Sequence, residues 1–185
     1  MLTGDMKTPL IYGLYMALAG LVLNLVLYFA GFHSEVDKLG TAQTIATIGN
    51  LILGVTLLVL GIKARRAEIP PTEDFGYGRA LWAGVQISFF ACIFGIITNF
   101  LYMNVINRGL RELMVQAQIA KWETLGMSSD RIEQAEKMMR MMMNPAMQAV
   151  FGLLFGMLIC TVISLIAAAF LKRPAQDNLA PPVAV

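Results

Sequence analysis

Four long apolar stretches, separated by short polar segments, dominate the pattern of this sequence. Residues 10–32, 41–62, 80–106 and 146–171 contain no Asp, Glu, Lys or Arg. Each stretch reaches the roughly 20 residues that cross the hydrocarbon core of a bilayer. We therefore predict an all-α polytopic membrane protein that forms a single domain over residues 1–185, with transmembrane helices at about 9–32, 41–62, 79–106 and 145–171.

Small residues recur at every fourth position in the third and fourth predicted spans. On the third span they are Gly76, Ala80, Gly84, Ser88 and Cys92. On the fourth span they are Gly152, Gly156, Cys160, Ser164 and Ala168. Small residues at this spacing allow two helix backbones to approach closely in a membrane. We therefore predict that the third and fourth spans pack together, with the two cysteines at similar depth.

The segment between these spans, residues 107–144, has the pattern of two amphipathic helices. Apolar residues from Leu110 to Leu125 follow helical spacing, and Gly126 is expected to end the first helix. Ser128 is a candidate N-cap for the second helix, and Asn144 followed by Pro145 is typical of the start of the last span. The sequence predicts an extramembrane helical hairpin.

A methionine-rich face lies on the second helix of this hairpin. Its apolar positions are expected to contact lipid or a partner, and are Ile132, Met138, Met139 and Met142. Thioether sulfur is a soft ligand for Cu(I), but Met is also a flexible apolar side chain suited to adaptable surfaces. Packing is favoured over metal binding here, so no metal and no cofactor is expected.

Composition and charge support a membrane location. The chain is 57% hydrophobic and 14% charged, against about 25% charged in soluble domains. The net charge of +2 comes without a basic block, so nucleic acid is not an expected partner. Among the short segments, four basic residues lie between the second and third spans and only one between the first and second. This bias predicts that both termini are cytoplasmic and that the hairpin lies outside. The tail at 174–185 is expected to be disordered.

Polar residues within the spans are few and uncharged. Candidates for contact with a transported solute are Asn24, Asn50, Gln86, Asn99 and Asn104. We expect Asn24 to hydrogen-bond to a neighbouring helix, which is the commoner role of a membrane asparagine. His33 has no second histidine or nearby cysteine, so it is expected to be solvated rather than metal-bound. Without a cluster of His, Cys and Asp side chains, an enzyme is not predicted.

Two sequence features resemble a known family. One is the Gly-Tyr-Gly-Arg-Ala entry at 76–80; the other is the insert at 125–136, which reads Leu-Gly-Met-Ser-Ser-Asp-Arg-Ile-Glu-Gln-Ala-Glu and is followed by methionines and Asn144-Pro145. The chain resembles the bacterial domain-of-unknown-function family 4199. The resemblance implies four spans in the bacterial inner membrane and supplies no catalytic residues.

Three functions are consistent with these patterns. The favoured one is a membrane scaffold or interaction protein, with a homo-oligomer or another membrane protein as partner, acting through the hairpin. An Oxa-type insertase also carries a charged hairpin between spans, but it holds that hairpin in the cytoplasm and has a polar groove within the membrane. A small oligomeric channel or transporter remains open for a neutral solute, because the spans carry amides and no charge.

Overall fold

The computed structural model describes residues 6–175, and these fold into helices without a β-strand. The membrane helices are α1 (Lys7–Phe29), α2 (Val36–Ala67), α3 (Tyr77–Leu101) and α6 (Pro145–Leu171). The π-helix η1 (Tyr102–Ile106) continues α3, and α4 (Leu110–Thr124) and α5 (Ser129–Met142) form the hairpin. Four helices are long and apolar enough to cross a membrane. The predicted fold class, an all-α multi-pass membrane protein, is confirmed.

Three helices depart from the expected spans, and α1, expected at 9–32, already ends at Phe29. α2 extends beyond the expected 41–62 at both ends, with Asp37 in its first turn and Arg65 and Arg66 in its last. An acidic first turn and a basic last turn stabilise a helix through its dipole, so the helix continues past the uncharged stretch. α3 changes to a π-helix for its final turn, which the Asn107 N–H closes by donating to the Tyr102 carbonyl at 2.8 Å.

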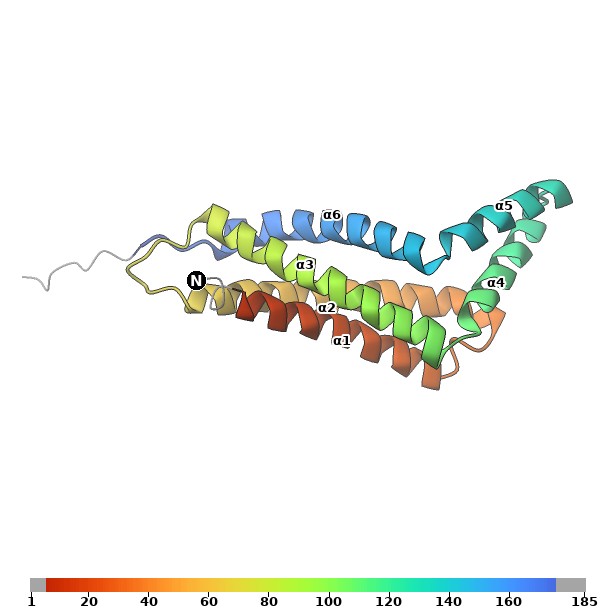
Figure 1. Cartoon of the computed structure of the whole chain (residues 1–185), viewed down its shortest axis with the longest axis horizontal. Helices are drawn as coiled ribbons and strands as arrows, with labels where there is room; N and C mark the ends of the chain where they lie inside the picture. The colour runs from red at the N-terminus through yellow and green to blue at the C-terminus, as the bar shows by residue number, and fades with distance from the viewer. Residues whose placement is uncertain (1–5, 176–185) are drawn as a thin grey trace, which may run out of the picture.

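The four long helices lie side by side, and the hairpin projects from one end (Figure 1). α1 begins and α6 ends at the opposite end, where the connection between α2 and α3 also lies. We refer to these as the hairpin end and the loop end. The predicted tail at 174–185 lies outside the described residues apart from Pro174 and Ala175.

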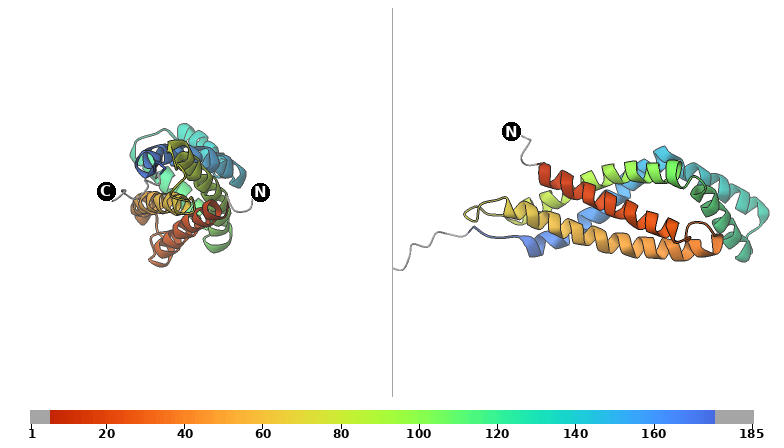
Figure 2. Two further views of the ribbon diagram at one scale, coloured as in Figure 1. Left: turned by 90° about the vertical axis from the view of Figure 1, so that its left-hand side faces the viewer. Right: turned by 90° about the horizontal axis from the view of Figure 1, so that it is seen from below.

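α3 is the central packing element of the bundle, since it packs against α6, α1 and α2. Figure 2 shows the four helices surrounding the bundle axis in the end-on view. A loop-end core is built from Leu58, Ile62, Phe75, Ala80, Ala83, Ile87, Ala167, Ala168 and Leu171. A smaller hairpin-end core is built from Leu39, Tyr102 and Leu110. Apolar packing therefore closes each end of the bundle with its own core. The polar side chains Asn24, Asn50 and Asn99 of the spans lie between these two cores.

A backbone bridge ties the loop end together. Phe75 and Arg173 exchange two backbone hydrogen bonds, of 2.9 and 2.8 Å. The Arg173 side chain also donates to the carbonyl of Ile69 at 2.9 Å. These contacts hold the start of α3 to the end of α6.

Two of the predicted local signals act as expected, whereas Ser128 precedes α5 as its N-cap residue without a side-chain cap hydrogen bond. Gly126 follows α4 with φ of 71°, a left-handed value that glycine adopts without strain. Asn144 caps α6, since its side-chain oxygen accepts from the Ala146 N–H at 2.9 Å. Arg140 of α5 joins the two hairpin helices through two hydrogen bonds to Glu112, of 2.9 and 3.0 Å, which lower the pKa of that carboxyl.

Candidate functional site

The two ridges of small residues lie along the α3–α6 contact. A Cβ added at Gly84 would lie 2.5 Å from Ser164 Oγ, and one at Gly156 would lie 2.9 Å from Cys92 Sγ. Ser88 and Cys160 interact through a side-chain hydrogen bond, and Ala80 and Ala168 are fully buried. The structure therefore brings eight of the ten predicted residues to this contact.

The two remaining ridge positions lie elsewhere. The three atoms nearest to a Cβ at Gly76 all belong to Asp74, and at Gly152 nothing lies within 4 Å. Gly76 is the N-cap residue that precedes α3, and Gly152 is the first member of the ridge on α6.

Close packing of α1 on α3 was not identified from the sequence. A Cβ at Gly13 would lie 2.5 Å from Phe90 Cβ and 2.8 Å from the Ala91 backbone nitrogen. Gly13, Ala17 and Gly20 carry the same small-residue signal at three- and four-residue spacing, which would have revealed this second contact.

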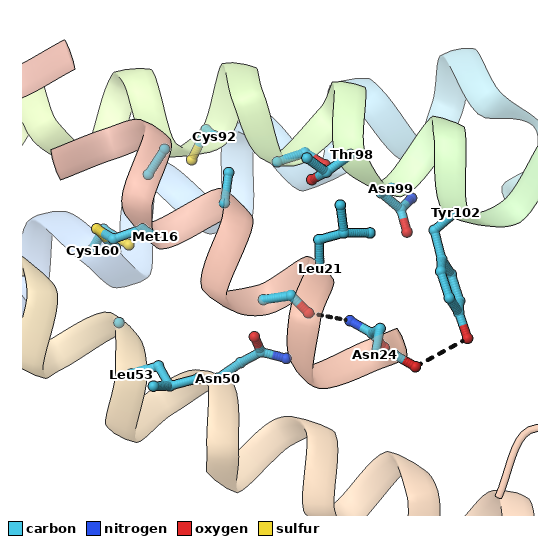
Figure 3. A pocket seen from close by; sticks show the side chains of 15 residues that line it. Met16, Leu21, Asn24, Asn50, Leu53, Cys92, Thr98, Asn99, Tyr102 and Cys160 are labelled. Atoms are coloured by element: carbon cyan, nitrogen blue, oxygen red, sulfur yellow. Dashed lines mark hydrogen bonds between the residues drawn. The ribbon is translucent and has the colours of Figure 1, made fainter. Parts of the chain in front are cut away.

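A cavity of about 280 Å³ lies between α1, α2, α3 and α6. Figure 3 shows asparagine side chains from three of these helices around it. Its lining residues are Met16, Ala17, Gly20, Leu21, Asn24, Asn50, Leu53, Gly54, Ala91, Cys92, Gly95, Thr98, Asn99, Tyr102 and Cys160. None of them is charged, and amide and hydroxyl groups lie among mostly apolar neighbours, so this central cavity is neutral.

Asn24 and Asn50 present amides to the central cavity. Asn24 donates to the Gly20 carbonyl of its own helix at 2.9 Å, so the predicted side-chain bond to another helix is wrong. Asn50, near the middle of α2, makes no side-chain hydrogen bond to any other described residue. A polar group at this depth is costly in a membrane unless it has a partner, so Asn50 has unused capacity for a ligand or water.

Two more polar groups complete the lining on α3. Asn99 donates to Gln148 of α6 at 3.4 Å, and the Thr98 hydroxyl donates to the Gly95 carbonyl at 3.1 Å. Of the five polar candidates from the sequence, three meet at this cavity, whereas Gln86 lines a separate one at the loop end and Asn104 bonds to Phe100 within its own helical segment.

A second cavity adjoins the first at the hairpin end, with a volume of about 120 Å³. It shares Asn24, Asn99 and Tyr102 with the central cavity, and Leu110 and Met114 of α4 contribute to its wall. We call it the outer cavity. The hairpin therefore covers one end of the polar region.

His33 lines the outer cavity, which overturns its expected solvation. It is 8% exposed, and its Nδ1 lies 2.5 Å from the Tyr102 hydroxyl. Burial lowers the pKa of this imidazole from the ordinary value of 6.5. The correction arises because α4 and η1 cover the connection between α1 and α2, a contact that the sequence pattern around His33 does not show.

The methionine face of the hairpin is partly covered. Met138 and Met142 are exposed, whereas Ile132 and Met139 are half-buried. Its role in lipid or partner contact stays a prediction. No group of three His, Cys, Asp or Glu side chains placed to hold a metal ion occurs within residues 6–175.

Comparison with known proteins identifies one match. A family model described as "Protein of unknown function (DUF4199)" matches residues 11–173. No curated protein and no solved structure matches the chain.

Proposed function

This chain belongs to the DUF4199 family of proteins of unknown function, and on that premise we propose that it binds and carries a small neutral polar solute across a membrane. The observation that supports this most is the central cavity, in which the amide of Asn50 has no partner among the described residues. Amide and hydroxyl groups donate and accept hydrogen bonds without a charge. Such a lining suits solutes that carry hydroxyl or amide groups.

The packing at the two ends supports a carrier rather than an open pore. The loop-end core closes one side of the central cavity with fully buried side chains, among them Leu58, Ile62 and Ile87. The outer cavity adjoins the other side. A solute would therefore enter from the hairpin end once the contacts between the two cavities open, and its release at the loop end requires the loop-end core to open, as in alternating access.

Replacement of Asn50 by Leu should slow solute passage. The change keeps the branching at Cγ and replaces two N–H donors and one carbonyl acceptor by methyl groups, so we expect glycerol and urea permeability to fall about fivefold to tenfold. The measurement is the rate of reswelling, by light scattering, of vesicles that contain the full chain after an osmotic step with either solute.

Asn104→Leu provides the matched control, because Asn104 lies outside both cavities and bonds to Phe100 at 2.7 Å. It should reswell as the unaltered protein does. Vesicles with the unaltered protein that reswell no faster than protein-free vesicles would contradict the proposed function. Equal rates for Asn50→Leu and the unaltered protein would exclude the central cavity as the route.

The membrane and its sidedness are also proposals. Basic residues gather at the loop end, including Lys63, Arg66, Arg79 and Lys172, and the positive-inside rule favours a cytoplasmic location for them. Both termini would then be cytoplasmic, in the bacterial inner membrane, with the hairpin outside. Labelling of a cysteine placed at Ser129 by a membrane-impermeant reagent on intact cells decides this, since a cytoplasmic hairpin would not react.

A second proposed function is self-association through the hairpin, which makes the chain an interaction protein. Met138 and Met141 are 62% and 61% exposed, just before α6, whose own outer face is apolar and exposed. We expect Met141→Cys to form disulfide-linked dimers in the membrane and Ser129→Cys, near the hairpin tip, to form fewer. If Met141→Cys forms only monomers, this interface is excluded.

The insertase alternative gains no support, because no charged residue lines the central cavity.

A further inference from the structure

The side chain of Tyr102 stands between the two cavities. It lines both of them and is 3% exposed. Figure 3 shows its ring at the hairpin end of the central cavity, with the hydroxyl directed toward Asn24. Tyr102 is also the first residue of the π-helix η1, and π-helical turns are frequent at functional sites. A solute that enters from the outer cavity must pass this ring.

Two hydrogen bonds hold the Tyr102 hydroxyl in place. It donates to the backbone carbonyl of Asn24 at 3.3 Å, and its oxygen lies 2.5 Å from Nδ1 of His33. A phenol has one proton. When that proton goes to Asn24, the Nδ1–H of His33 donates to the phenol oxygen. The chain of bonds then runs from His33 through Tyr102 to Asn24 and joins η1 to α1 and to the connection that follows α1.

We propose that Tyr102 and His33 form a pH-sensitive gate between the hairpin side of the membrane and the central cavity. The gate rests on the proposed function, because it regulates entry to that same site. It is closed when neutral His33 holds the Tyr102 hydroxyl, and it opens when His33 is protonated and leaves its buried position.

The surroundings of His33 disfavour its charged form. The outer cavity receives Leu39 and Gln43 from α2, Asn24 from α1, and Leu110 and Met114 from α4. None of these is charged. The aromatic neighbours of the imidazole are the phenols of Tyr102 and of Tyr28, which packs against the Tyr102 ring. The acidic side chains on the same connection, Glu35 and Asp37, are exposed, and Glu35 pairs with Lys38 at 2.9 Å. A buried imidazolium therefore has no carboxylate partner among the residues lining the outer cavity.

The direction of the pH effect follows from this burial. The closed gate lowers the pKa of His33 below 6.5, so the closed state binds fewer protons than the open state. The closed state therefore has its full stabilisation at pH values above 6.5. It loses that stabilisation as the pH falls through the lowered pKa of His33. Acid should therefore open the gate.

Cysteine labelling in vesicles tests the gate. Ala17→Cys, in a chain that lacks Cys92 and Cys160, reports on the central cavity, because Ala17 is buried and lines that cavity and not the outer one. The probe is 2-hydroxyethyl methanethiosulfonate, an uncharged thiol reagent. The rate at which the reagent labels the cavity cysteine at each pH is divided by the rate at which it labels Ser129→Cys on the exposed hairpin. This ratio, the relative labelling rate, removes the pH dependence of the reagent itself.

At pH 7.5 we expect Tyr102→Phe to raise the relative labelling rate about tenfold, because it removes both hydrogen bonds. At pH 5 the rate with Tyr102 intact should rise to a similar level. His33→Gln, which can donate to Tyr102 but cannot become charged, should label slowly at both values of pH. The results for His33→Gln and for the pH response of the unaltered gate test the proposal even if Tyr102→Phe does not fold.

Two results would overturn the proposal in different ways. Rapid labelling that is independent of pH and of Tyr102→Phe would exclude the gate and leave the solute cavity in place. No labelling of Ala17→Cys in any variant, at either pH, would show that the central cavity is inaccessible and would exclude the proposed function as well.

Discussion

Gly13→Val should destabilise the protein by about 3 kcal/mol, through overpacking of the α1–α3 contact. A Cβ at this position would lie 2.5 Å from Phe90 Cβ, 2.8 Å from the Ala91 nitrogen and 3.0 Å from the Ile87 carbonyl oxygen. Two of these three atoms belong to the backbone of α3, so no rotamer change can relieve the contact. α1 must move away, and close packing is what holds membrane helices together.

The measurement is unfolding by SDS titration from mild detergent micelles, followed by tryptophan fluorescence. Gly13→Val should lower the midpoint with little change in slope. Gly152→Val is the matched control, because Gly152 is exposed and nothing lies within 4 Å of its added Cβ. The control should stay within about 0.5 kcal/mol of the unaltered protein. Equal midpoints for the two variants would contradict the packing of α1 described above.

Gly84→Val should cost about 2 kcal/mol, by separating α6 from α3. Its Cβ would lie 2.5 Å from Ser164 Oγ, 2.7 Å from Ser164 Cβ and 3.2 Å from Ile62 Cδ1. The expected cost is smaller than at Gly13 because none of the three is a main-chain atom and the nearest, the Ser164 hydroxyl, can turn away from its bond to the Cys160 carbonyl. Ser164 Cβ is fixed by the backbone, so α6 must still shift. The same SDS titration measures the effect.

A compensating pair makes this second prediction specific to the α3–α6 contact. Gly84→Ala alone should destabilise, and Ser164→Gly should restore much of the loss by removing the atoms that the added methyl group would meet. Contacting residues give non-additive free energies of this kind. If the two single losses simply add in the double variant, Gly84 and Ser164 do not share a contact.

The membrane fold could be predicted from the sequence because lipid leaves few alternatives. Backbone polar groups in hydrocarbon must be satisfied internally, so an uncharged run of sufficient length forms a helix. The hairpin also follows from local signals, since Gly126 and Asn144 act within a few residues of themselves. These features need no knowledge of how the helices are arranged.

The contact between α3 and α6 was predictable only in part. Spacing of small residues showed which helix faces would approach, and it led to Gly84 and Ser164. It did not show where the contact ends, so Gly76 was included although it precedes α3, and Gly152 although nothing lies within 4 Å of its added Cβ. Register along a helix pair depends on both helices and on the connections between them, which a pattern in one segment does not contain.

The polar centre depended on the tertiary structure. Asn24, Asn50 and Asn99 come from three different spans and share no sequence spacing, yet they line one cavity. His33 lies in a connection that carries the charged residues Glu35, Asp37 and Lys38, a context typical of solvent exposure, but α4 and Tyr102 bury it.

By itself, the sequence determined four apolar helices, a charged hairpin and a ridge of small residues on each of two spans, because each depends on local composition and on the demands of lipid. Only the tertiary structure decided which amides face a common cavity, which glycine holds α1 against α3 and that Tyr102 meets His33. Those contacts join residues far apart in the chain, and their geometry is set by packing of the whole bundle.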